Sequence, residues 1–176
     1  MEVTVWGDRV AALQVASEVS AWFSDFLGMN VDLVLMPESS HRKMDPRYAV
    51  QEESVSFADG MPYVMIGQAS LDDLNGRLSD PVGMDRFRPN LVFSGGEAYA
   101  EDQFTRVKVG EVDFQVVKPC ARCVMITVNQ QTGEKAKEPL ATLATYRTVN
   151  NKVYFGQNAV ALAPGMVRVG DFIQQG

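Results

Sequence analysis

The chain has 176 residues, which matches the usual size of a single domain. Its 16 Lys and Arg against 22 Asp and Glu give a net charge of −6, a sign that repels nucleic-acid phosphates and anionic lipids. The composition, 46% apolar and 22% charged, excludes disordered, collagen-like and coiled-coil proteins. We therefore expect one domain over residues 1–176, with neither nucleic acid nor membrane among its partners.

Nothing in the sequence indicates export or a membrane span. No apolar run approaches the ~18–20 residues that a spanning helix needs. The start, Met1 to Asp8, lacks the basic and apolar regions of a secretory signal, and it is typical of a strand that begins in mid-domain. The two cysteines lie three positions apart and do not form the disulfide framework of small secreted domains. We expect a cytoplasmic location.

The N-terminal part predicts a hairpin followed by a helix. Strands over Val3–Trp6 and Val10–Val15 flank Gly7-Asp8, a pair that often closes a two-residue turn. The helix then ends at Gly28, where a left-handed stop is expected. Its apolar residues recur at i, i+3, i+4 and i+7 and predict a buried face: Val19, Trp22, Phe23 and Phe26.

The middle of the chain predicts a strand, a long loop and a second helix. Val31–Leu35 alternates as a half-buried strand does. Pro37–Ser56 has neither the helical nor the strand periodicity and exceeds the ~12–15 residues of an ordinary loop. It is therefore either a functional segment, such as a lid or a partner surface, or a loop that is simply solvated. Ser70 and Asp73 have the spacing of a capping box, which predicts a helix that Pro81 ends.

The C-terminal half reads mainly as strands, with one short helix opened by Pro139. Gly156 lies inside a strand pattern, which indicates a bulge or a close backbone approach. Many short strands without a βαβ rhythm favour a mainly antiparallel sheet or closed barrel with flanking helices. The expected strands are Leu91–Ser94, Phe104–Val109, Val112–Lys118, Cys123–Asn129, Val153–Leu162 and Met166–Ile173.

The segment Lys118-Pro119-Cys120-Ala121-Arg122-Cys123 allows four interpretations. A zinc site lacks a second cysteine pair and has only His41 to draw on, and a redox dithiol lacks its usual helix N-terminus. Two inert buried cysteines are the third interpretation. The fourth is a thiolate ligand to a soft metal, favoured by the charges of Lys118 and Arg122. Spacing alone does not say which cysteine would serve.

Two further segments carry groups that could hold a ligand. One is Arg86-Phe87-Arg88-Pro89-Asn90. An arginine guanidinium suits phosphate or carboxylate, and the Asn90 amide supplies both a donor and an acceptor. Pro89 favours an extended backbone at Arg88. Ser56-Phe57-Ala58-Asp59-Gly60 could bend backbone around a ligand. Each segment is also typical of a plain turn.

Taken together and in this order, the motifs make the chain similar to the MOSC domain, the C-terminal module of molybdenum cofactor sulfurases. The similarity is strongest to its branch that reduces amidoximes and other N-hydroxylated bases. The matching stretches run nearly the whole length: Val5-Trp6-Gly7-Asp8, Ser56-Phe57-Ala58-Asp59-Gly60, Ala69–Asn75, Phe87-Arg88-Pro89-Asn90, Lys118–Cys123, Thr132-Gly133-Glu134, Phe155-Gly156-Gln157-Asn158 and Val169-Gly170-Asp171.

This resemblance implies an antiparallel MOSC-type β-barrel that binds a molybdenum–pterin cofactor. It implies that Cys123 binds molybdenum, with Cys120 a neighbour only, and that Arg88 and Asn90 contact the cofactor. Backbone near Ala58 and Asp59 is expected beside it. A soft thiolate suits a high-valent metal, and a guanidinium with an amide suits phosphate and pterin edges.

The resemblance also implies an enzyme that reduces N–O bonds of amidoximes or hydroxylaminopurines, with electrons from a separate protein or domain. Relatives carry a longer N-terminal region with further basic cofactor contacts, so we expect this sequence to be an excerpt that binds the cofactor poorly by itself. The alternative function is a sulfur-carrier or cofactor-binding module that serves a pyridoxal-phosphate-dependent desulfurase.

Overall fold

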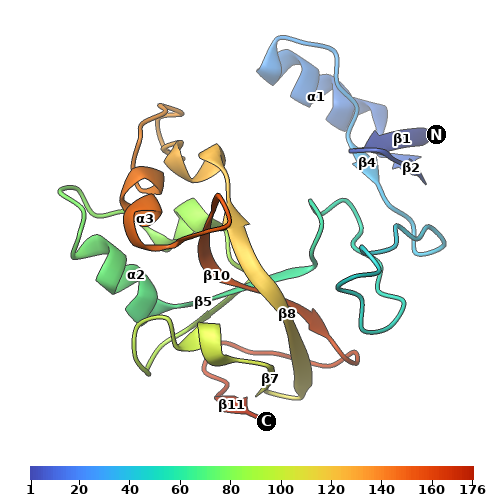
Figure 1. Cartoon of the computed structure of the whole chain (residues 1–176). Coiled ribbons are helices and arrows are strands. Elements are labelled where there is room, and N and C mark those ends of the chain that lie inside the picture. Colours follow the sequence, from blue (N-terminus) through green and yellow to red (C-terminus); the bar gives the residue numbers. More distant parts are fainter. The chain divides into compact units, whose positions relative to one another are not determined.

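The computed structural model describes all 176 residues, which divide into two units. Unit 1 is Met1–Arg47 with Glu52–Gly60, and unit 2 is Tyr48–Gln51 with Met61–Gly176. Unit 1 contains one helix and two small sheets, whereas unit 2 contains the main sheet (Figure 1).

In unit 1, strands β1 (Glu2–Val5) and β2 (Asp8–Ala11) form an antiparallel hairpin in which Val5 faces Asp8. The turn is therefore Trp6-Gly7, one residue before the predicted Gly7-Asp8, and Trp6 adopts a positive φ of 55° there. A second sheet pairs β3 (Leu13–Gln14) with β4 (Val34–Leu35).

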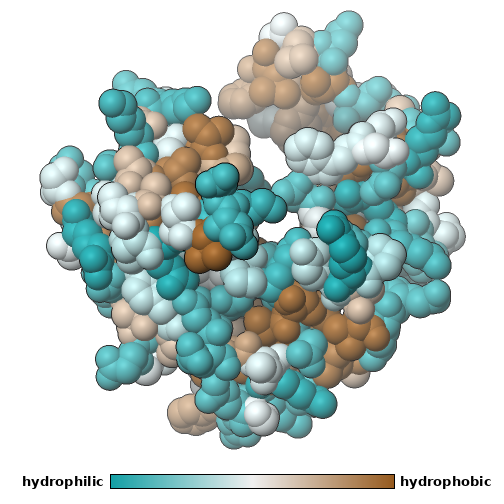
Figure 2. All heavy atoms as spheres, viewed as in Figure 1, coloured by the Kyte–Doolittle hydropathy of each residue, from teal (hydrophilic) through white to brown (hydrophobic).

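Helix α1 (Ser17–Leu27) ends as predicted, because Gly28 is left-handed and its N–H donates to the Ser24 carbonyl. The prediction of a buried aromatic face is wrong. Trp22 and Phe26 are 59% and 74% exposed and stack on each other, with ring centroids 5.4 Å apart. Hydrophobic residues accordingly gather at the surface over α1 (Figure 2).

The long loop before unit 2 keeps its predicted irregular character. Between β4 and the next strand no helix or strand forms, and the segment is held by one isolated bridge between Lys43 and Ser54. The expected strand over Val31–Leu35 is reduced to its last two residues.

The main sheet of unit 2 runs in the order β11-β7-β8-β10-β5-β6, with β9 beside β10, and curls into a nearly closed barrel (Figure 1). All pairs are antiparallel except β5 with β6. The predicted mainly β fold with flanking helices is thus confirmed. The strands are β5 (Tyr63–Gly67), β6 (Leu91–Phe93), β7 (Arg106–Val109), β8 (Val112–Arg122), β9 (Thr148–Val149), β10 (Lys152–Ala161) and β11 (Ile173–Gln175).

Helices and 3-10 turns flank this sheet. They are α2 (Gln68–Asn75), η1 (Met84–Phe87), η2 (Ala100–Gln103), η3 (Val124–Thr127) and α3 (Leu140–Tyr146). One core cluster packs helices on the sheet through Ile66, Leu74, Phe87, Leu143 and Phe155. A second cluster includes Met65, Val107, Phe114 and Ala159 from β5, β7, β8 and β10.

Three predictions for unit 2 are wrong in detail. Helix α2 begins at Gln68, so Ser70 lies inside it and not at a cap, and the helix ends at Asn75, well before Pro81. The strand expected over Met166–Ile173 shrinks to β11, which pairs with β7.

The bulge predicted at Gly156 is present. The register of β10 against β8 shifts between Tyr154 and Gln157, and Gly156 has a φ of 77°. A Cβ there would lie 2.6 Å from Ile66 Cγ1 and 2.8 Å from the Met65 carbonyl. Glycine is therefore required both by the backbone conformation and by the close approach of β5.

Candidate functional site

Cys123 lies at the end of the long strand β8, in extended backbone directly before the 3-10 turn η3. The predicted strand over Cys123–Asn129 is therefore wrong. The Ile126 N–H donates to the Cys123 carbonyl at 3.4 Å, and Thr127 Oγ1 donates to the Val124 carbonyl at 2.8 Å, so these bonds close a turn. The Cys123 thiol is free and exposed, which leaves its sulfur accessible to a ligand or reagent.

Cys120 has a different environment. Its thiol is free but half-buried and interacts with the Asn158 side chain. Burial raises the pKa of Cys120, although the charges of Arg122 and Lys118 and the Asn158 hydrogen bond act in the opposite direction. The neighbouring cations therefore act on Cys120 in the expected direction, but burial outweighs them.

Arg88 follows η1 in a left-handed conformation, with φ 49° and ψ 50°. The prediction that Pro89 would make Arg88 extended is wrong, because the Arg88 N–H closes the turn by donating to the Asp85 carbonyl at 3.2 Å. A non-glycine residue held in this region stores about 1–3 kcal/mol of strain, and such strain concentrates at functional sites. The Arg88 side chain is exposed.

Asn90 ties the start of β6 to β5. Its N–H donates to the Val64 carbonyl, and its Oδ1 accepts from the Val64 N–H, both at 2.9 Å. The amide oxygen thus accepts one hydrogen bond within the fold, whereas the Nδ2 donor is available to a ligand. Asn90 also lines a cavity of about 1300 Å³ between β6 and β11, which neither Arg88 nor Cys123 lines.

Arg122 connects the turn that precedes Arg88 with the strand end that precedes Cys123. Its Nη1 donates to the Phe87 carbonyl at 2.9 Å, and its Nε donates to the Phe155 carbonyl at 2.8 Å. Arg86 adds a bond from Nη1 to the Ile126 carbonyl at 3.3 Å. The structure therefore packs η1 and η3, the turns next to Arg88 and Cys123, against each other.

Ala58 and Asp59 belong to unit 1, where a buried arginine holds their backbone. Arg42 Nη1 donates to the Ala58 carbonyl at 2.6 Å, and its Nη2 donates to the Asp59 carbonyl at 3.2 Å. Arg42 Nε also pairs with Asp8 at 2.8 Å, while Trp6 Nε1 donates to Asp59 Oδ1 at 2.6 Å. Two of the sequence motifs that lie far apart in the chain thus meet around Arg42.

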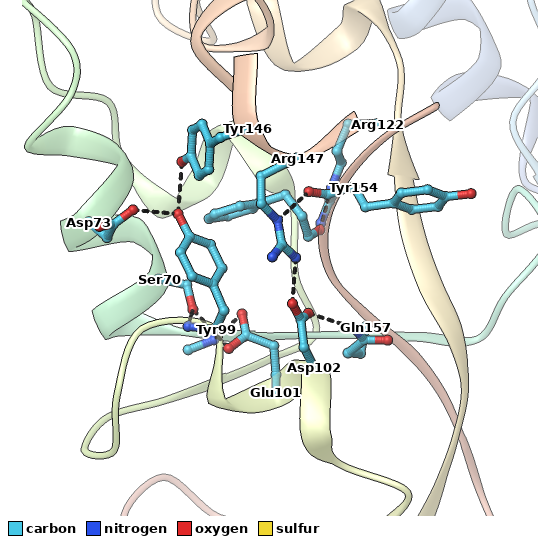
Figure 3. A network of polar contacts seen from close by, with 12 residues as sticks. Ser70, Asp73, Tyr99, Glu101, Asp102, Arg122, Tyr146, Arg147, Tyr154 and Gln157 are labelled. Atoms are coloured by element: carbon cyan, nitrogen blue, oxygen red, sulfur yellow. Dashed lines mark hydrogen bonds and ion pairs between the residues drawn. The ribbon is translucent and has the colours of Figure 1, made fainter. Parts of the chain in front are cut away.

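A polar network between α2, η2 and α3 was not expected from the sequence (Figure 3). Glu101 is fully buried and accepts from Ser70 Oγ at 2.8 Å and from the Gly67 N–H at 3.3 Å. Burial raises the pKa of Glu101. The Tyr99 hydroxyl lies 2.6 Å from Asp73 and 2.7 Å from the Tyr146 hydroxyl.

A second part of the network surrounds Arg147, which lies between the Tyr154 carbonyl and Asp102 (Figure 3). Arg147 Nη2 pairs with Asp102 at 2.7 Å, and Gln157 Nε2 donates to the other Asp102 oxygen at 2.7 Å. These residues line a cavity of about 540 Å³. Because the polar groups satisfy one another, the network is a structural one.

The residues present fit a metal that brings most of its own ligands. The chain contains no group of three or more His, Cys, Asp or Glu side chains that could enclose a metal ion. One exposed thiol can nevertheless complete the coordination of a metal whose other ligands belong to a cofactor, and a thiolate suits a soft centre. Two protein cysteines acting together as a zinc site are not supported.

Comparison with known proteins gives concordant results. The family model of the MOSC domain matches residues 52–174. Mitochondrial amidoxime-reducing component 1 of Mus musculus is 34% identical over 97% of this chain and 54% of its own length. The human protein of that name is 33% identical over 95% of this chain and 53% of its own length. Molybdenum cofactor sulfurase of Oryza sativa subsp. japonica is 36% identical over 88% of this chain and 21% of its own.

Among solved structures, the crystal structure of YiiM from Geobacillus stearothermophilus matches with a TM-score of 0.48 and 17% identity, covering 65% of this chain and 54% of that one. The chain spans about half the length of the amidoxime-reducing relatives and about a fifth of the sulfurase.

The described helices include none with the length and hydropathy to cross a membrane. Since several relatives are named mitochondrial, a cytoplasmic location stays a prediction. The match over most of its length shows that this chain belongs to the MOSC domain family.

Proposed function

We propose that this chain binds a molybdenum–pterin cofactor and belongs to an oxidoreductase that reduces N–O bonds of N-hydroxylated compounds such as amidoximes. Membership of the MOSC family and identities of about 33–34% to amidoxime-reducing components support this function. The observation that carries it is the exposed, free thiol of Cys123 in a turn packed against the turn that leads to Arg88.

In this proposal Cys123 supplies the only protein ligand to the metal. Its position in extended backbone at the end of β8 fixes the sulfur on a rigid element. Arg88, strained and exposed, binds an anionic part of the cofactor, and Asn90 offers its Nδ2 donor to a carbonyl or ring acceptor. A cofactor contact by the backbone at Ala58 and Asp59, which Arg42 orders within unit 1, stays a prediction.

The cofactor would supply the two-electron chemistry, and the chain would supply position and electrostatics. The protein's task is to hold the cofactor through one thiolate, to orient its anionic groups with Arg88, and to leave one side open to substrate. The partners are a small N-hydroxylated substrate and a separate electron-donating protein or domain. Neither unit offers a redox centre of its own beyond the two free thiols.

The test is dye-driven reduction of benzamidoxime by the full-length parent of this expected excerpt, isolated from a host that makes the cofactor. We expect Cys123→Ser to reduce turnover to the background rate and Cys120→Ser to retain most of it, because only Cys123 is exposed. Equal loss in the two variants would argue for a dithiol mechanism. Full turnover in Cys123→Ser would exclude Cys123 as the metal ligand.

A second candidate is a sulfur-carrier or cofactor-binding module serving a pyridoxal-phosphate-dependent desulfurase. The observation in its favour is 36% identity to the rice molybdenum cofactor sulfurase. Incubation with a cysteine desulfurase and cysteine, followed by peptide mass spectrometry, distinguishes the two. A persulfide on Cys123 together with no amidoxime reduction would support the carrier function.

A further inference from the structure

The main sheet of unit 2 ends in two strands that have a neighbour on one side only. Strand β6 (Leu91–Phe93) pairs with β5, and β11 (Ile173–Gln175) pairs with β7, and the two stand at opposite ends of the strand order. The cavity of about 1300 Å³ lies between them, and residues of both strands line it. The barrel is therefore open along one seam, which we call the β6–β11 seam.

The hydrogen-bond pattern shows which backbone groups of β11 open into this seam. The Gly176 N–H donates to the Arg106 carbonyl at 3.0 Å, so in this antiparallel ladder the bonds to β7 come from every second residue, Gly176 and Gln174. The N–H and C=O groups of Ile173 and Gln175 then point away from β7. Ile173 and Gln175 accordingly line the cavity, whereas Gln174 does not. These groups form an edge that is ready to pair with a further strand.

Strands β6 and β11 run in the same direction. β6 is parallel to β5, and the steps from β5 to β10, β8, β7 and β11 are all antiparallel, so the last strand regains the direction of the first. A single strand of the opposite direction between β6 and β11 would form antiparallel ladders on both sides. Antiparallel pairing is the kind that dominates this sheet and is slightly the more stable.

The seam is too large and too weakly charged to suit a small polar ligand. Small-molecule pockets usually enclose about 300–1,000 Å³, which is less than this cavity. The lining contains one cation and one anion, Arg168 and Asp171, and the Asp171 carboxylate already accepts from the Arg168 N–H at 2.7 Å. Apolar side chains are exposed along the seam, Val92 to 50% and Phe172 to 85%. Free backbone groups combined with apolar contacts are the features by which a sheet binds an added strand.

We propose that a strand from the part of the parent protein outside residues 1–176 inserts into the β6–β11 seam and closes the barrel. The match to the amidoxime-reducing relatives covers only 53–54% of their length, so those proteins have ample further sequence. A segment of the same molecule reaches the seam at a high effective concentration. A second copy pairing edge to edge would satisfy β6 or β11 but not both.

The seam also defines the kind of segment that fits. The inserted strand is about 5–6 residues long, the usual length, and alternates apolar with polar side chains. Its apolar side chains pack on the second core cluster, of which Met65 and Val109 line the cavity. The remaining backbone groups of Ile173 and Gln175 bond to it.

The first test is amide hydrogen exchange in the purified full-length parent, read residue by residue by NMR. Gln174 is the internal control, because the ladder directs its N–H to β7. We expect the amides of Ile173 and Gln175 to exchange within about tenfold of the Gln174 rate, since all three are then hydrogen-bonded. Exchange of Ile173 and Gln175 more than about tenfold faster than Gln174 would overturn the proposal, because that difference is expected of an open edge.

The second test identifies the segment in the seam. The photoreactive residue p-benzoylphenylalanine replaces Phe172 in the parent, which is prepared as an equal mixture of isotopically light and heavy protein. We expect irradiation to join position 172 to a segment outside residues 1–176, with the same label on both peptides. Val149, 59% exposed on β9, is the matched control: it does not line the seam, so the same replacement there should not capture that segment.

Two outcomes of the cross-linking would overturn the proposal. One is a product with mixed labels, which indicates a second copy, or with a segment inside residues 1–176. The other is equal capture of the segment from position 149. If the photoreactive protein does not fold, hydrogen exchange in the unmodified parent still decides. Neither test uses Cys123 or turnover, so failure here is distinguishable from failure of the proposed reductase function.

Discussion

Two arginines, one in each unit, show how differently the same side chain can be buried. In unit 1, Arg42 is 6% exposed and pairs with Asp8 while donating to the carbonyls of Ala58 and Asp59. In unit 2, Arg122 donates to two carbonyls, has no carboxylate partner, and keeps one nitrogen unpartnered.

The difference is that Arg42 finds both an ion pair and hydrogen-bond acceptors within its unit, whereas Arg122 finds no ion pair and leaves one nitrogen without an acceptor. Arg42 satisfies its charge within unit 1 and thereby orders the segment that holds Asp59. Arg122 satisfies its hydrogen bonds only in part, next to the one exposed cysteine of the chain. A partly buried charge without a counter-ion is retained at a cost in stability, because the carbonyls that accept from Arg122 do not neutralise its charge.

The largest loss of stability should come from replacing Arg42, the arginine that has an ion pair. We expect Arg42→Met to destabilise unit 1 by about 3 kcal/mol, since it leaves several carbonyls and Asp8 without their donor. Arg122→Met should cost unit 2 only about 1 kcal/mol, because lost carbonyl bonds are offset by removal of an uncompensated charge.

Urea unfolding can measure the two variants separately. Both tryptophans, Trp6 and Trp22, lie in unit 1, so their fluorescence reports that unit, whereas far-ultraviolet circular dichroism includes the main sheet of unit 2. A larger loss of stability for Arg122→Met than for Arg42→Met would mean that Arg122 is the structural residue of the pair.

Gly156→Ala tests the bulge that presents the Phe155 carbonyl to Arg122. We expect a loss of about 2–3 kcal/mol, because a positive φ is combined with a Cβ that would overlap Ile66 and the Met65 carbonyl. Gly133→Ala is the control, since Gly133 also has a positive φ, of 74°, but has open space around it. That variant should lose only about 1 kcal/mol, and equal losses would show that packing at the bulge does not matter.

Glu101 is a fully buried acidic residue, whose stability contribution depends on pH. Burial raises its pKa, so the proton it holds stabilises the fold fully below the ordinary glutamate pKa, and this stability is lost as pH rises through the raised value. Glu101→Gln lacks that loss. We therefore expect the wild type to lose stability relative to Glu101→Gln in unfolding experiments as the pH rises above the ordinary glutamate pKa. A difference that does not change with pH would contradict this account.

The smallest effect is expected at the half-exposed edge of the network. Hydrogen bonds from Arg77, and then from Tyr99, lower the pKa of Asp73, so its contribution is present above the ordinary aspartate pKa and lost as pH falls. Because Arg77 is 48% exposed, solvent screens the pair, and Asp73→Asn should cost less than about 1 kcal/mol at neutral pH. In acid unfolding the variant and the wild type should converge; a persistent gap would point to packing instead.

The sequence was sufficient for patterns that depend on neighbouring residues. Strands β7 and β8, the Gly28 stop of α1 and the Gly156 bulge follow from periodicity and from glycine conformation. The 3-10 turn at Val124–Thr127 was missed because alternating apolar residues also suit a strand, and hydrogen bonds within the turn decided the outcome.

The candidate site could be predicted only as a set of residues in a familiar order. That Asn90 would commit its acceptor to Val64, or that Arg88 would be left-handed, depends on contacts between distant segments. The buried Glu101 and the unpartnered nitrogen of Arg122 have no signature in the sequence, because burial of a charged residue is a property of the folded chain.

The most direct test of the account is the molybdenum content of the longer parent protein of which this sequence is the expected excerpt, isolated from a host that makes the cofactor and measured by elemental analysis for the wild type, Cys120→Ser and Cys123→Ser. We predict that the wild type and Cys120→Ser retain comparable molybdenum, whereas Cys123→Ser retains almost none while keeping the same circular dichroism spectrum. Molybdenum retained equally by all three proteins would contradict the assignment of Cys123 as the metal ligand.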